Sequence, residues 1–404
     1  MRVKVQVLLL LPFLVAFELG SCANPPPGQF KSIFNFGNSL SDTGNYLAVG
    51  APAFPFIGQL PYGQTFFNRA TGRASDGRLI IDFIAESLGL PFLPPYLKLV
   101  EGPFVKTGVD FAVFGATALD AKFFVDRNLG PLLITTDSLS VQLGWFKKWK
   151  SSICTTKWEC DDYFKTSLFV VGEIGGNDYN VPLLFTSGSS LEQVRSFVPA
   201  VIEAIINATS ALIEEGAVNL LVPGNLPIGC IPAYLTAYQG SNQTTINPRT
   251  GCMDAFNAFS QYHNRLLIRA LYRLRKKYPH TRIMYADFYG ASIRFYNMPQ
   301  FFGKGFFLSL NIIKNDTALT MIYAISTSGF SRESLLTACC GGGGGPFNFN
   351  PNRVCGAPGS TVCKETTTHV SWDGVHLTDA AYRYMAKGVI NGPFTFPPLW
   401  FPIL

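Results

Sequence analysis

Charged residues are scarce in this sequence. Asp, Glu, Lys and Arg make up 14% of its 404 residues, whereas hydrophobic residues make up 48%. This balance excludes an intrinsically disordered chain and favours a packed globular protein with a large core. The net charge is +6, and the densest basic run, residues 273–277, ends a predicted amphipathic helix. We interpret that run as a solvated helix end, and we expect no nucleic-acid partner.

Long hydrophobic runs are also lacking, apart from one at the N-terminus. There Arg2 and Lys4 precede the apolar residues 5–17, and small residues follow at 21–23. This pattern is typical of a secretory signal peptide, and the run is too short to predict a membrane span. We therefore expect residues 1–23 to be removed and residues 24–404 to form one domain. No other stretch approaches 18 apolar residues, so we expect no stable membrane anchor after cleavage. We also expect a monomer.

Cysteine pairs at metal-binding spacing are absent as well. The chain has nine Cys but no Cys-x-x-Cys, so no metal site is predicted. Removal of Cys22 with the signal peptide leaves eight, an even number that favours disulfides in an oxidising compartment. Cys154–Cys160 and Cys230–Cys252 are candidate local pairs, but the connectivity stays open. The same compartment permits glycosylation at three Asn-x-Thr sequons, which begin at Asn207, Asn242 and Asn315.

Apolar segments of strand type alternate with amphipathic segments of helix type along most of the chain. This alternation predicts an α/β fold with a parallel central sheet that helices cover on both faces. Neither an internal repeat nor a linker divides the chain. Strands are expected at 30–36, 108–114, 167–171, 217–222 and 282–287, and helices at 75–89, 138–150, 191–215, 254–278 and from about 379 onward.

Two long segments interrupt the alternation. Residues 48–71 are rich in Pro, Gly and aromatic side chains, and residues 291–350 are expected to be irregular. Five glycines at 341–345 could suggest a phosphate-binding loop, but no Lys-Ser/Thr follows them. We interpret them as part of a Cys-flanked loop, and we expect no cofactor.

The first predicted strand leads into the stretch around which the chain is organised. The apolar residues 30–36 end at Gly37, and Ser39 follows in a polar turn. Parallel sheets bind ligands beyond the carboxyl ends of their strands, where such a turn presents a hydroxyl outward. Taken alone, a Gly-x-Ser after a strand is usually an ordinary turn. The rest of the chain must therefore supply partners for Ser39.

Those partners come from late in the chain. Asp373 precedes His376 by three residues in a turn. That spacing lets the carboxylate accept a hydrogen bond from the Nδ1–H of the imidazole and leaves Nε2 free as a base. A serine hydroxyl becomes a good nucleophile only when such a base takes its proton. We therefore predict Ser39, His376 and Asp373 as a catalytic triad.

Two further strand ends carry groups that could stabilise an oxyanion. Gly115 follows the second strand and Asn177 follows the third. The backbone N–H of Gly115, the amide of Asn177 and the N–H of Ser39 would together supply preorganised donors. Each feature has an ordinary structural explanation as a turn residue. Only their joint occurrence at successive strand ends favours catalysis.

At this point the motifs resemble the plant GDSL esterase/lipases of the SGNH hydrolase superfamily. The resemblance implies a flavodoxin-like three-layer α/β/α fold, a carboxylic ester substrate, and the triad and oxyanion roles given above. Together with the predicted signal peptide, it favours a protein that reaches the apoplast or the vacuole through the secretory pathway. The stretch 62–78 is most similar to the acetylajmalan esterase and sinapine esterase type, which favours a small acyl ester of a specialised metabolite. The matching segments are residues 36–45, 61–78, the segment around Gly115, and residues 174–179, 339–348 and 372–376.

One residue departs from the family pattern. The family usually has Asp before the nucleophile, and this chain has Asn38. Asn keeps the shape of Asp but lacks the charge and adds an N–H₂ donor. Two alternatives to a hydrolase also stay open. An acyltransferase could use the same triad if apolar segments at 52–67 and 301–310 cover the site and exclude water. A binding protein could keep the fold without the activity.

Overall fold

The computed structural model describes residues 30–99, 106–186, 189–238, 240–241, 245–304, 308–315, 318–325 and 328–399. A six-stranded sheet in the order β12-β5-β4-β3-β1-β2 forms the centre. Five strands are parallel and β12 pairs antiparallel with β5. This flavodoxin-like order confirms the predicted α/β fold. The strands are β1 (Ser32–Phe36), β2 (Gly108–Asp110), β3 (Ser167–Val171), β4 (Asn219–Pro223), β5 (Arg282–Ala286) and β12 (Thr395–Phe396).

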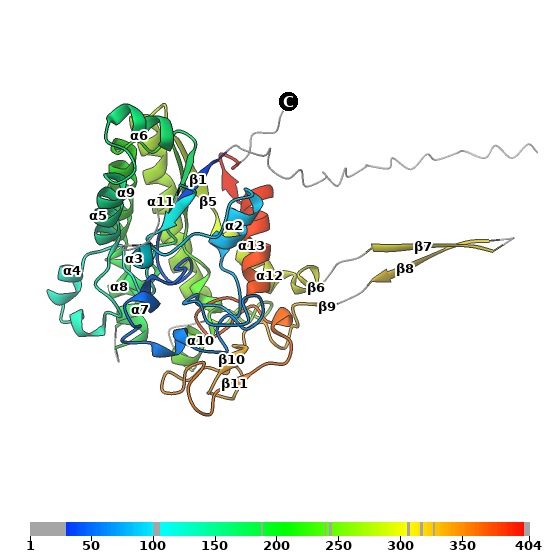
Figure 1. The fold of residues 1–404 in the computed structure, drawn as a ribbon. Coiled ribbons are helices and arrows are strands. Elements are labelled where there is room, and N and C mark those ends of the chain that lie inside the picture. Colours follow the sequence, from blue (N-terminus) through cyan, green and yellow to red (C-terminus); the bar gives the residue numbers. More distant parts are fainter. Residues whose placement is uncertain are drawn as a thin grey trace, which may run out of the picture.

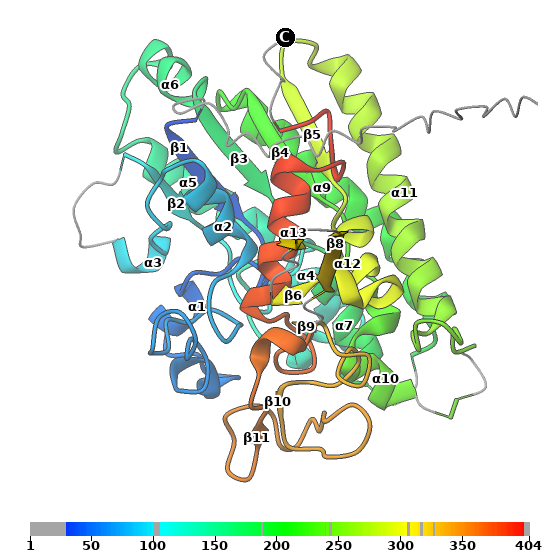
Figure 2. The same ribbon diagram turned by 90° about the vertical axis from the view of Figure 1, so that its right-hand side faces the viewer.

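Helices cover both faces of this sheet (Figures 1 and 2). Successive side chains of a strand point to opposite faces, so Phe34 and Ile33 belong to two different buried clusters. Phe34 packs among α5, α6, α9 and α11, and Ile33 lies in the cluster with α2, α12 and α13. The helices are α2 (Ile80–Ser87), α5 (Leu139–Lys150), α6 (Lys157–Phe164), α9 (Val198–Glu214), α11 (Asp254–Lys277), α12 (Phe288–Asn297) and α13 (Asp379–Asn391).

Shorter elements line the carboxyl edge of the sheet and the loops. The helices among them are α1 (Asn45–Ala48), α3 (Tyr96–Leu99), α4 (Ala121–Val125), α7 (Gly176–Leu184), α8 (Leu191–Arg195) and α10 (Pro232–Tyr238). The short strands are β6 (Gly303–Lys304), β7 (Leu308–Asn315), β8 (Ala318–Ile325), β9 (Ser328–Gly329), β10 (Cys340–Gly341) and β11 (Thr361–Val362). The hairpin β7–β8 projects away from the body (Figure 1).

The expected single helix at 191–215 is wrong in one respect, because it is broken into α8 and α9. Pro199 lies four residues after Arg195, so its ring would clash with that carbonyl group in a continuous helix. The stretch Leu191–Glu214 is long and apolar enough to cross a membrane by length and composition alone, and it is the one such stretch in the described part of the chain. One side of α9 is buried in the core through Val198, Val201, Ile205 and Leu212. Packing on the sheet therefore accounts for its apolar character.

Three other expectations need correction. The helix expected at 75–89 starts only at Ile80, because residues 75–78 form a turn that holds other parts of the chain. The strand expected at 108–114 ends at Asp110, although Phe111 and Val113 still donate N–H groups to the carbonyl oxygens of Asn35 and Gly37. The segment 291–350 is not wholly irregular, for it contains most of α12 and the hairpin β7–β8.

Four disulfides cross-link the described chain. Both candidate pairs, Cys154–Cys160 and Cys230–Cys252, are present, which confirms those predictions. The other two are Cys339–Cys363 and Cys340–Cys355, in the loops before α13. Residues 1–23, predicted as a signal peptide, and Asn242 lie outside the described residues. Asn207 is exposed on α9, and Asn315 ends β7.

Candidate active site

Ser39 lies in the turn that follows β1, where the sequence predicts it. Backbone N–H groups close this turn on the carbonyl oxygen of Asn38. Gly37 allows a close approach to the neighbouring turn, since an added Cβ would lie 3.1 Å from the carbonyl oxygen of Glu173 and 2.9 Å from Ser41 Oγ. Ser39 is thus presented at the carboxyl edge of the sheet.

A continuous hydrogen-bonded chain links Ser39 to two residues from the other end of the sequence. Ser39 Oγ lies 2.8 Å from His376 Nε2, and His376 Nδ1 lies 2.7 Å from Asp373 Oδ2. All three residues are buried, with exposed fractions of 5–7%. In this arrangement the imidazole can take the hydroxyl proton at Nε2 while the carboxylate holds the Nδ1 proton.

The carboxylate of Asp373 has four hydrogen-bond donors. Oδ1 accepts the backbone N–H groups of His376 and Val375, at 2.8 and 3.0 Å. Oδ2 accepts the hydroxyl of the buried Tyr62 at 2.8 Å, besides the imidazole. Burial opposes ionisation, but the charge and hydrogen bonds of His376 and the N–H of Val375 still hold the pKa of Asp373 below its usual value. Burial and the Asp373 charge raise the pKa of Tyr62, so this hydroxyl stays a donor.

Gly115 lies in the loop that leaves the end of β2. Its φ is +81°, and an added Cβ would lie 2.5 Å from Ile134 Cβ. A side chain there would therefore be strained and would collide with its neighbour. Gly115, Asn177 and Ser39 line the same cavity, so the structure brings these predicted residues together.

The amide of Asn177 is held in one orientation. Its Nδ2 donates to the carbonyl oxygen of Ala116 at 2.9 Å, and its Oδ1 accepts from Asn180 Nδ2 at 3.0 Å. Asn180 in turn accepts from the hydroxyl of the buried Tyr234 at 2.6 Å. An amide carries two N–H donors, so the second one of Asn177 can meet a substrate oxygen.

Asp178, the next residue, ties the Gly115 loop to α7. Its carboxylate oxygens accept the N–H groups of Ala118 and Leu119, at 2.8 and 2.9 Å. Burial raises the pKa of Asp178 to about 7, and these N–H groups act in the opposite direction. The relative position of Gly115 and Asn177 therefore depends on a buried carboxyl group.

Two more buried acids tie the Ser39 loop to the Gly115 loop. Asp42 Oδ2 accepts the N–H of Phe114 at 2.8 Å. Asp110 Oδ2 accepts both the N–H and the hydroxyl of Thr43, at 2.7 and 2.9 Å. Burial and then the charge of Asp42 raise the pKa of Asp110 to about 8. Each acid thus crosses from one loop to the other.

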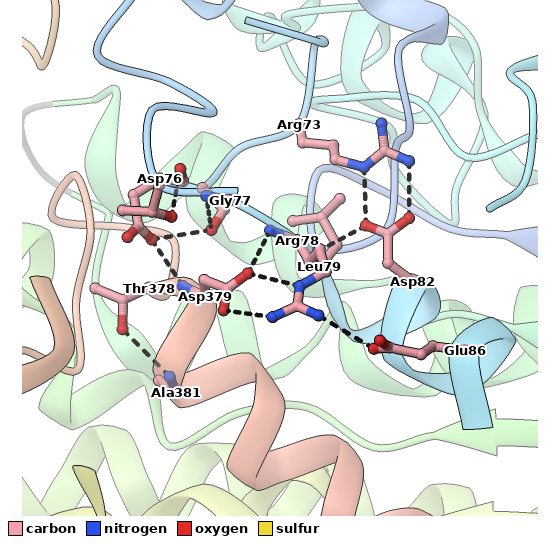
Figure 3. Close-up of polar contacts among 12 residues, drawn as sticks. Arg73, Asp76, Gly77, Arg78, Leu79, Asp82, Glu86, Thr378, Asp379 and Ala381 are labelled. Atoms are coloured by element: carbon pink, nitrogen blue, oxygen red, sulfur yellow. Dashed lines mark hydrogen bonds and ion pairs between the residues drawn. The ribbon is translucent and has the colours of Figure 1, made fainter. Parts of the chain in front are cut away.

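The segment that carries His376 is anchored at the start of α13 (Figure 3). Asp76 accepts the N–H of Asp379 at 2.7 Å. The guanidinium group of Arg78 contacts both carboxylate oxygens of Asp379, at 3.0 and 3.2 Å. The hydroxyl of Thr378 caps the helix by accepting an N–H at 3.2 Å. These contacts fix the helix that begins three residues after His376.

A cavity of about 450 Å³ opens at these residues. Part of the predicted cover, 52–67, contributes to its wall, whereas no residue of 301–310 is among its described lining. Apart from Ser39, Asp373 and His376, the described wall is mainly apolar. Its apolar side chains include Ala53, Phe54, Phe114, residues 131–134, Leu184, Phe185, Ala233, Phe349, Pro351 and Val354.

One group among the described residues approaches a metal-ligand set. Cys339, Cys363 and His369 bring their ligand atoms within 4.8 Å of one another. Both sulfur atoms belong to the disulfide Cys339–Cys363, so they offer no thiolate. This set does not fit a metal ion.

Sequence reasoning missed several residues that position the site. Tyr62 lies 311 positions before Asp373, and Glu173 lies 135 positions after Asn38. The resemblance marks the stretch 61–78 that contains Tyr62, but no spacing rule assigns its role. Buried acids directly after strands were the available indication for Glu173.

Comparisons with known proteins agree with this geometry. The GDSL-like lipase/acylhydrolase family matches residues 33–389. One GDSL esterase/lipase of Arabidopsis thaliana is 48% identical over 98% of this chain and 99% of its own length, and another is 44% identical over 93% and 89%. Sinapine esterase of Brassica napus is 41% identical over 93% of this chain and 89% of its own length. The chain therefore belongs to the GDSL lipase/acylhydrolase family, a membership that supports a carboxylic ester hydrolase.

Proposed function

We propose that this protein is a secreted serine esterase that hydrolyses a small acyl ester of a plant specialised metabolite through an acyl-enzyme on Ser39. One observation carries the proposal: the unbroken hydrogen-bonded chain from Ser39 through His376 to Asp373, at 2.8 and 2.7 Å. All three residues line a mainly apolar cavity of about 450 Å³, a volume within the range of small-molecule sites.

In the acylation half of the reaction, Ser39 Oγ attacks the carbonyl carbon of the ester while His376 Nε2 takes the hydroxyl proton. Asp373 keeps the imidazole in the tautomer with the proton on Nδ1 and stabilises the imidazolium that forms. The oxyanion of the tetrahedral intermediate is held by the N–H groups of Ser39 and Gly115 and by Asn177 Nδ2. When the intermediate collapses, the C–O bond to the alcohol breaks, and His376 returns the proton to the leaving oxygen.

In the deacylation half, water replaces the alcohol. His376 removes a proton from water as the oxygen attacks the acyl-enzyme, and the same donors hold the second oxyanion. The bond to Ser39 Oγ then breaks, and the serine regains its proton from the imidazolium. The products are a free carboxylic acid and an alcohol.

Three properties of the relatives and of the chain support the finer parts of the proposal. One relative is named sinapine esterase, which favours an ester of a specialised metabolite as substrate. Four disulfides fit an oxidising compartment, which favours the apoplast or the vacuole after removal of residues 1–23. Asn207 is exposed on α9, so a glycan can be attached there.

The test compares Ser39→Ala with Ser41→Ala in purified, glycosylated protein. Ser41 lies two residues away and its buried hydroxyl has no hydrogen-bond partner, so its removal controls for a general disturbance of the turn. We expect Ser39→Ala to lower turnover of p-nitrophenyl acetate by roughly a thousandfold or more, and Ser41→Ala to keep it within about threefold. Equal activity in Ser39→Ala and the parent would refute the proposal. A fluorophosphonate probe should label the parent on Ser39, and an absence of labelling would favour a binding protein.

A second candidate function is acyl transfer, because Ala53, Phe54 and Tyr62 of the segment 52–67 contribute to the wall of the cavity. An alcohol could resolve the acyl-enzyme if this wall kept water out. Product analysis with an acyl donor and candidate alcohols separates the two activities. If free acid is the sole product with every acceptor, hydrolysis stands and transfer is excluded.

A further inference from the structure

We propose that Asn38 and Glu173 form a positioning pair that sets the distance between two of the oxyanion donors. The inference rests on the proposed function of Ser39. Asn38 directly precedes Ser39, and Glu173 starts the turn that leads to Asn177. The pair therefore joins the loop of the nucleophile to the loop of the side-chain donor.

Each side-chain oxygen and nitrogen atom of the pair has a hydrogen-bond partner. Asn38 Nδ2 donates to Glu173 Oε2 at 2.9 Å, and Asn38 Oδ1 accepts the N–H of Leu40 at 3.0 Å. Glu173 Oε1 accepts the N–H of Gly176 at 3.1 Å. Both residues are 3% exposed, so water is poorly placed to replace a lost partner. These bonds connect Asn38 and Leu40, the two neighbours of Ser39, to Gly176, the residue before Asn177.

The surrounding chain supports the same junction. Gln142 of α5 makes two hydrogen bonds to the backbone of Gly37, the residue before Asn38. Its Oε1 accepts the N–H of Gly37 and its Nε2 donates to the carbonyl oxygen of Gly37, both at 2.9 Å. Burial raises the pKa of Glu173 to about 7, while its bonds to Asn38 and Gly176 act in the opposite direction. Titratable groups that interact with the Glu173 charge are Asp178, Tyr179, Tyr234 and Tyr382.

The pattern of donors explains why an amide suits position 38 in this chain. A carboxylate at Glu173 offers acceptors only, and it already faces the N–H of Gly176. Asn38 supplies the N–H that the second oxygen needs, without any shared proton. An Asp at position 38 would instead face a second carboxyl group, and the two would need one proton between them. Asn38, which replaces the usual Asp of the family, thus supplies the donor that Glu173 needs.

This assignment predicts the outcome of exchanging the two groups. In Glu173→Gln the new N–H₂ faces the N–H₂ of Asn38. If the Asn38 amide rotates to relieve this, its oxygen no longer accepts the N–H of Leu40. One pair of donors is opposed in either case. In the double variant Asn38→Asp, Glu173→Gln the Asp accepts from Leu40 and from the Gln, and the Gln oxygen accepts from Gly176. The double variant therefore satisfies all the donors with the polarity of the pair reversed.

The third variant carries a specific pH signature. Asn38→Asp alone keeps its bonds while one proton is shared, and loses them when alkaline pH removes that proton. The parent and the double variant have a single carboxyl group at the pair, so no proton is shared between two carboxyl groups. In the parent, loss of the Glu173 proton near pH 7 leaves an acceptor for the N–H₂ of Asn38, so alkaline pH does not break the bond. Asp178 and the neighbouring tyrosines are present in all four proteins, and they interact with the charge at the pair. The Asn38→Asp profile is therefore compared with the parent and with the double variant, which keeps one carboxyl group at the pair. We expect a falling alkaline limb in Asn38→Asp only.

The experiment measures kcat and KM for p-nitrophenyl acetate between pH 5.5 and 9.5 in the parent and the three variants. Glu203→Gln, an exposed change on α9, is the matched control. We expect Glu173→Gln to lower kcat by roughly ten- to a hundredfold with KM little changed, since the oxyanion exists only in the transition state. The double variant should return to within about threefold of the parent.

Two results would overturn the inference. One is a double variant as slow as Glu173→Gln or slower, and the other is an Asn38→Asp profile that follows the parent at alkaline pH. Thermal unfolding of each protein shows whether it is folded, and if a single variant fails to fold, the double variant against the parent still decides. Absence of turnover and of fluorophosphonate labelling in the parent would refute the proposed function itself, so the two failures are distinct.

Discussion

Replacing Tyr62 by Phe removes one oxygen atom from behind the proposed triad and leaves the ring in place. The hydroxyl is fully buried and donates to Asp373 Oδ2 at 2.8 Å. Hydrogen bonds to charged acceptors contribute about 1.5–3 kcal/mol, and we expect the free energy of unfolding to fall by that amount. An unfolding entropy of about 2.1 cal/mol/K per residue over the 404 residues gives roughly 0.85 kcal/mol/K. The midpoint of thermal unfolding should therefore fall by about 2–4 °C.

The same change should alter the pH dependence of catalysis. Without the hydroxyl, the charge on Asp373 is less dispersed and stabilises the imidazolium form of His376 more strongly. Because the proposed base must be neutral, the rising limb of kcat/KM moves to higher pH. If the whole bond energy acted on the imidazolium, the shift would be about 1–2 pH units, at 1.36 kcal/mol per unit. Since the hydroxyl also stabilises the carboxylate when the imidazole is neutral, we expect a few tenths of a unit to about one unit.

The assay is kcat/KM for p-nitrophenyl acetate from pH 5 to 9, together with thermal unfolding. Tyr285→Phe is the matched control, because Tyr285 is another buried tyrosine hydrogen-bonded to a carboxylate, that of Asp287, and it does not line the cavity. It should lower stability without moving the limb. The reasoning fails if the limb of Tyr62→Phe stays in place or moves to lower pH. Tyr62 would then contribute only packing.

Three further outcomes are expected. Arg73→Leu leaves the buried carboxylate of Asp82 without its paired guanidinium group, which should lower the free energy of unfolding by about 3–5 kcal/mol. Lys157→Leu removes an exposed ion pair and should lower it by less than about 1 kcal/mol. Equal shifts of the unfolding midpoint in the two variants would contradict this expectation. Replacing residues 305–327 by a two-residue Asn-Gly turn should preserve turnover, because β6 and β9 already pair antiparallel where the segment leaves and returns, and loss of folded protein would contradict it. Thermal stability should be higher at pH 5.5 than at pH 8. The buried carboxyl groups of Asp110, Glu173 and Asp178 have pKa values of about 7–8, so in this range they bind protons only in the folded state. His263, whose pKa burial lowers to about 3, acts in the opposite direction below about pH 6.5. It does so over about one pH unit, whereas each of the three carboxyl groups acts over about 1.5 to 2.5 units, so a lower stability at pH 5.5 would contradict the prediction.

The arrangement of Ser39, Gly115 and Asn177 could be predicted because each residue closely follows a buried strand. Parallel strands end at one edge of the sheet, so short-range patterns in the sequence translate directly into proximity. The pairing of Asp373 with His376 is also local, since three residues separate them. These features needed only strand recognition and side-chain chemistry.

Other parts of the site depend on contacts that no local pattern encodes. Tyr62 reaches Asp373 from a loop with little regular structure, and Asp76 reaches the start of α13 across 303 positions. Residues 75–78 are predicted as the first turn of a helix, but the apolar spacing behind that prediction begins only at Leu79. The polar side chains of residues 75–78 bind other segments instead, and that choice depends on tertiary structure.

The buried acids around Ser39 follow from a shortage of backbone partners. Loops at the end of a sheet leave N–H groups that no neighbouring strand accepts, and burial makes such groups costly unless they are paired. A carboxylate provides two oxygens with about four acceptor positions, so one Asp can hold several N–H groups from two loops. Asp42 accepts from Gly44, Asn45, Tyr46 and Phe114 in this way. In a chain with only 14% charged residues, an acid within a few residues of a strand end is therefore best interpreted as a loop anchor, and Glu173 beside Asn38 fits that rule.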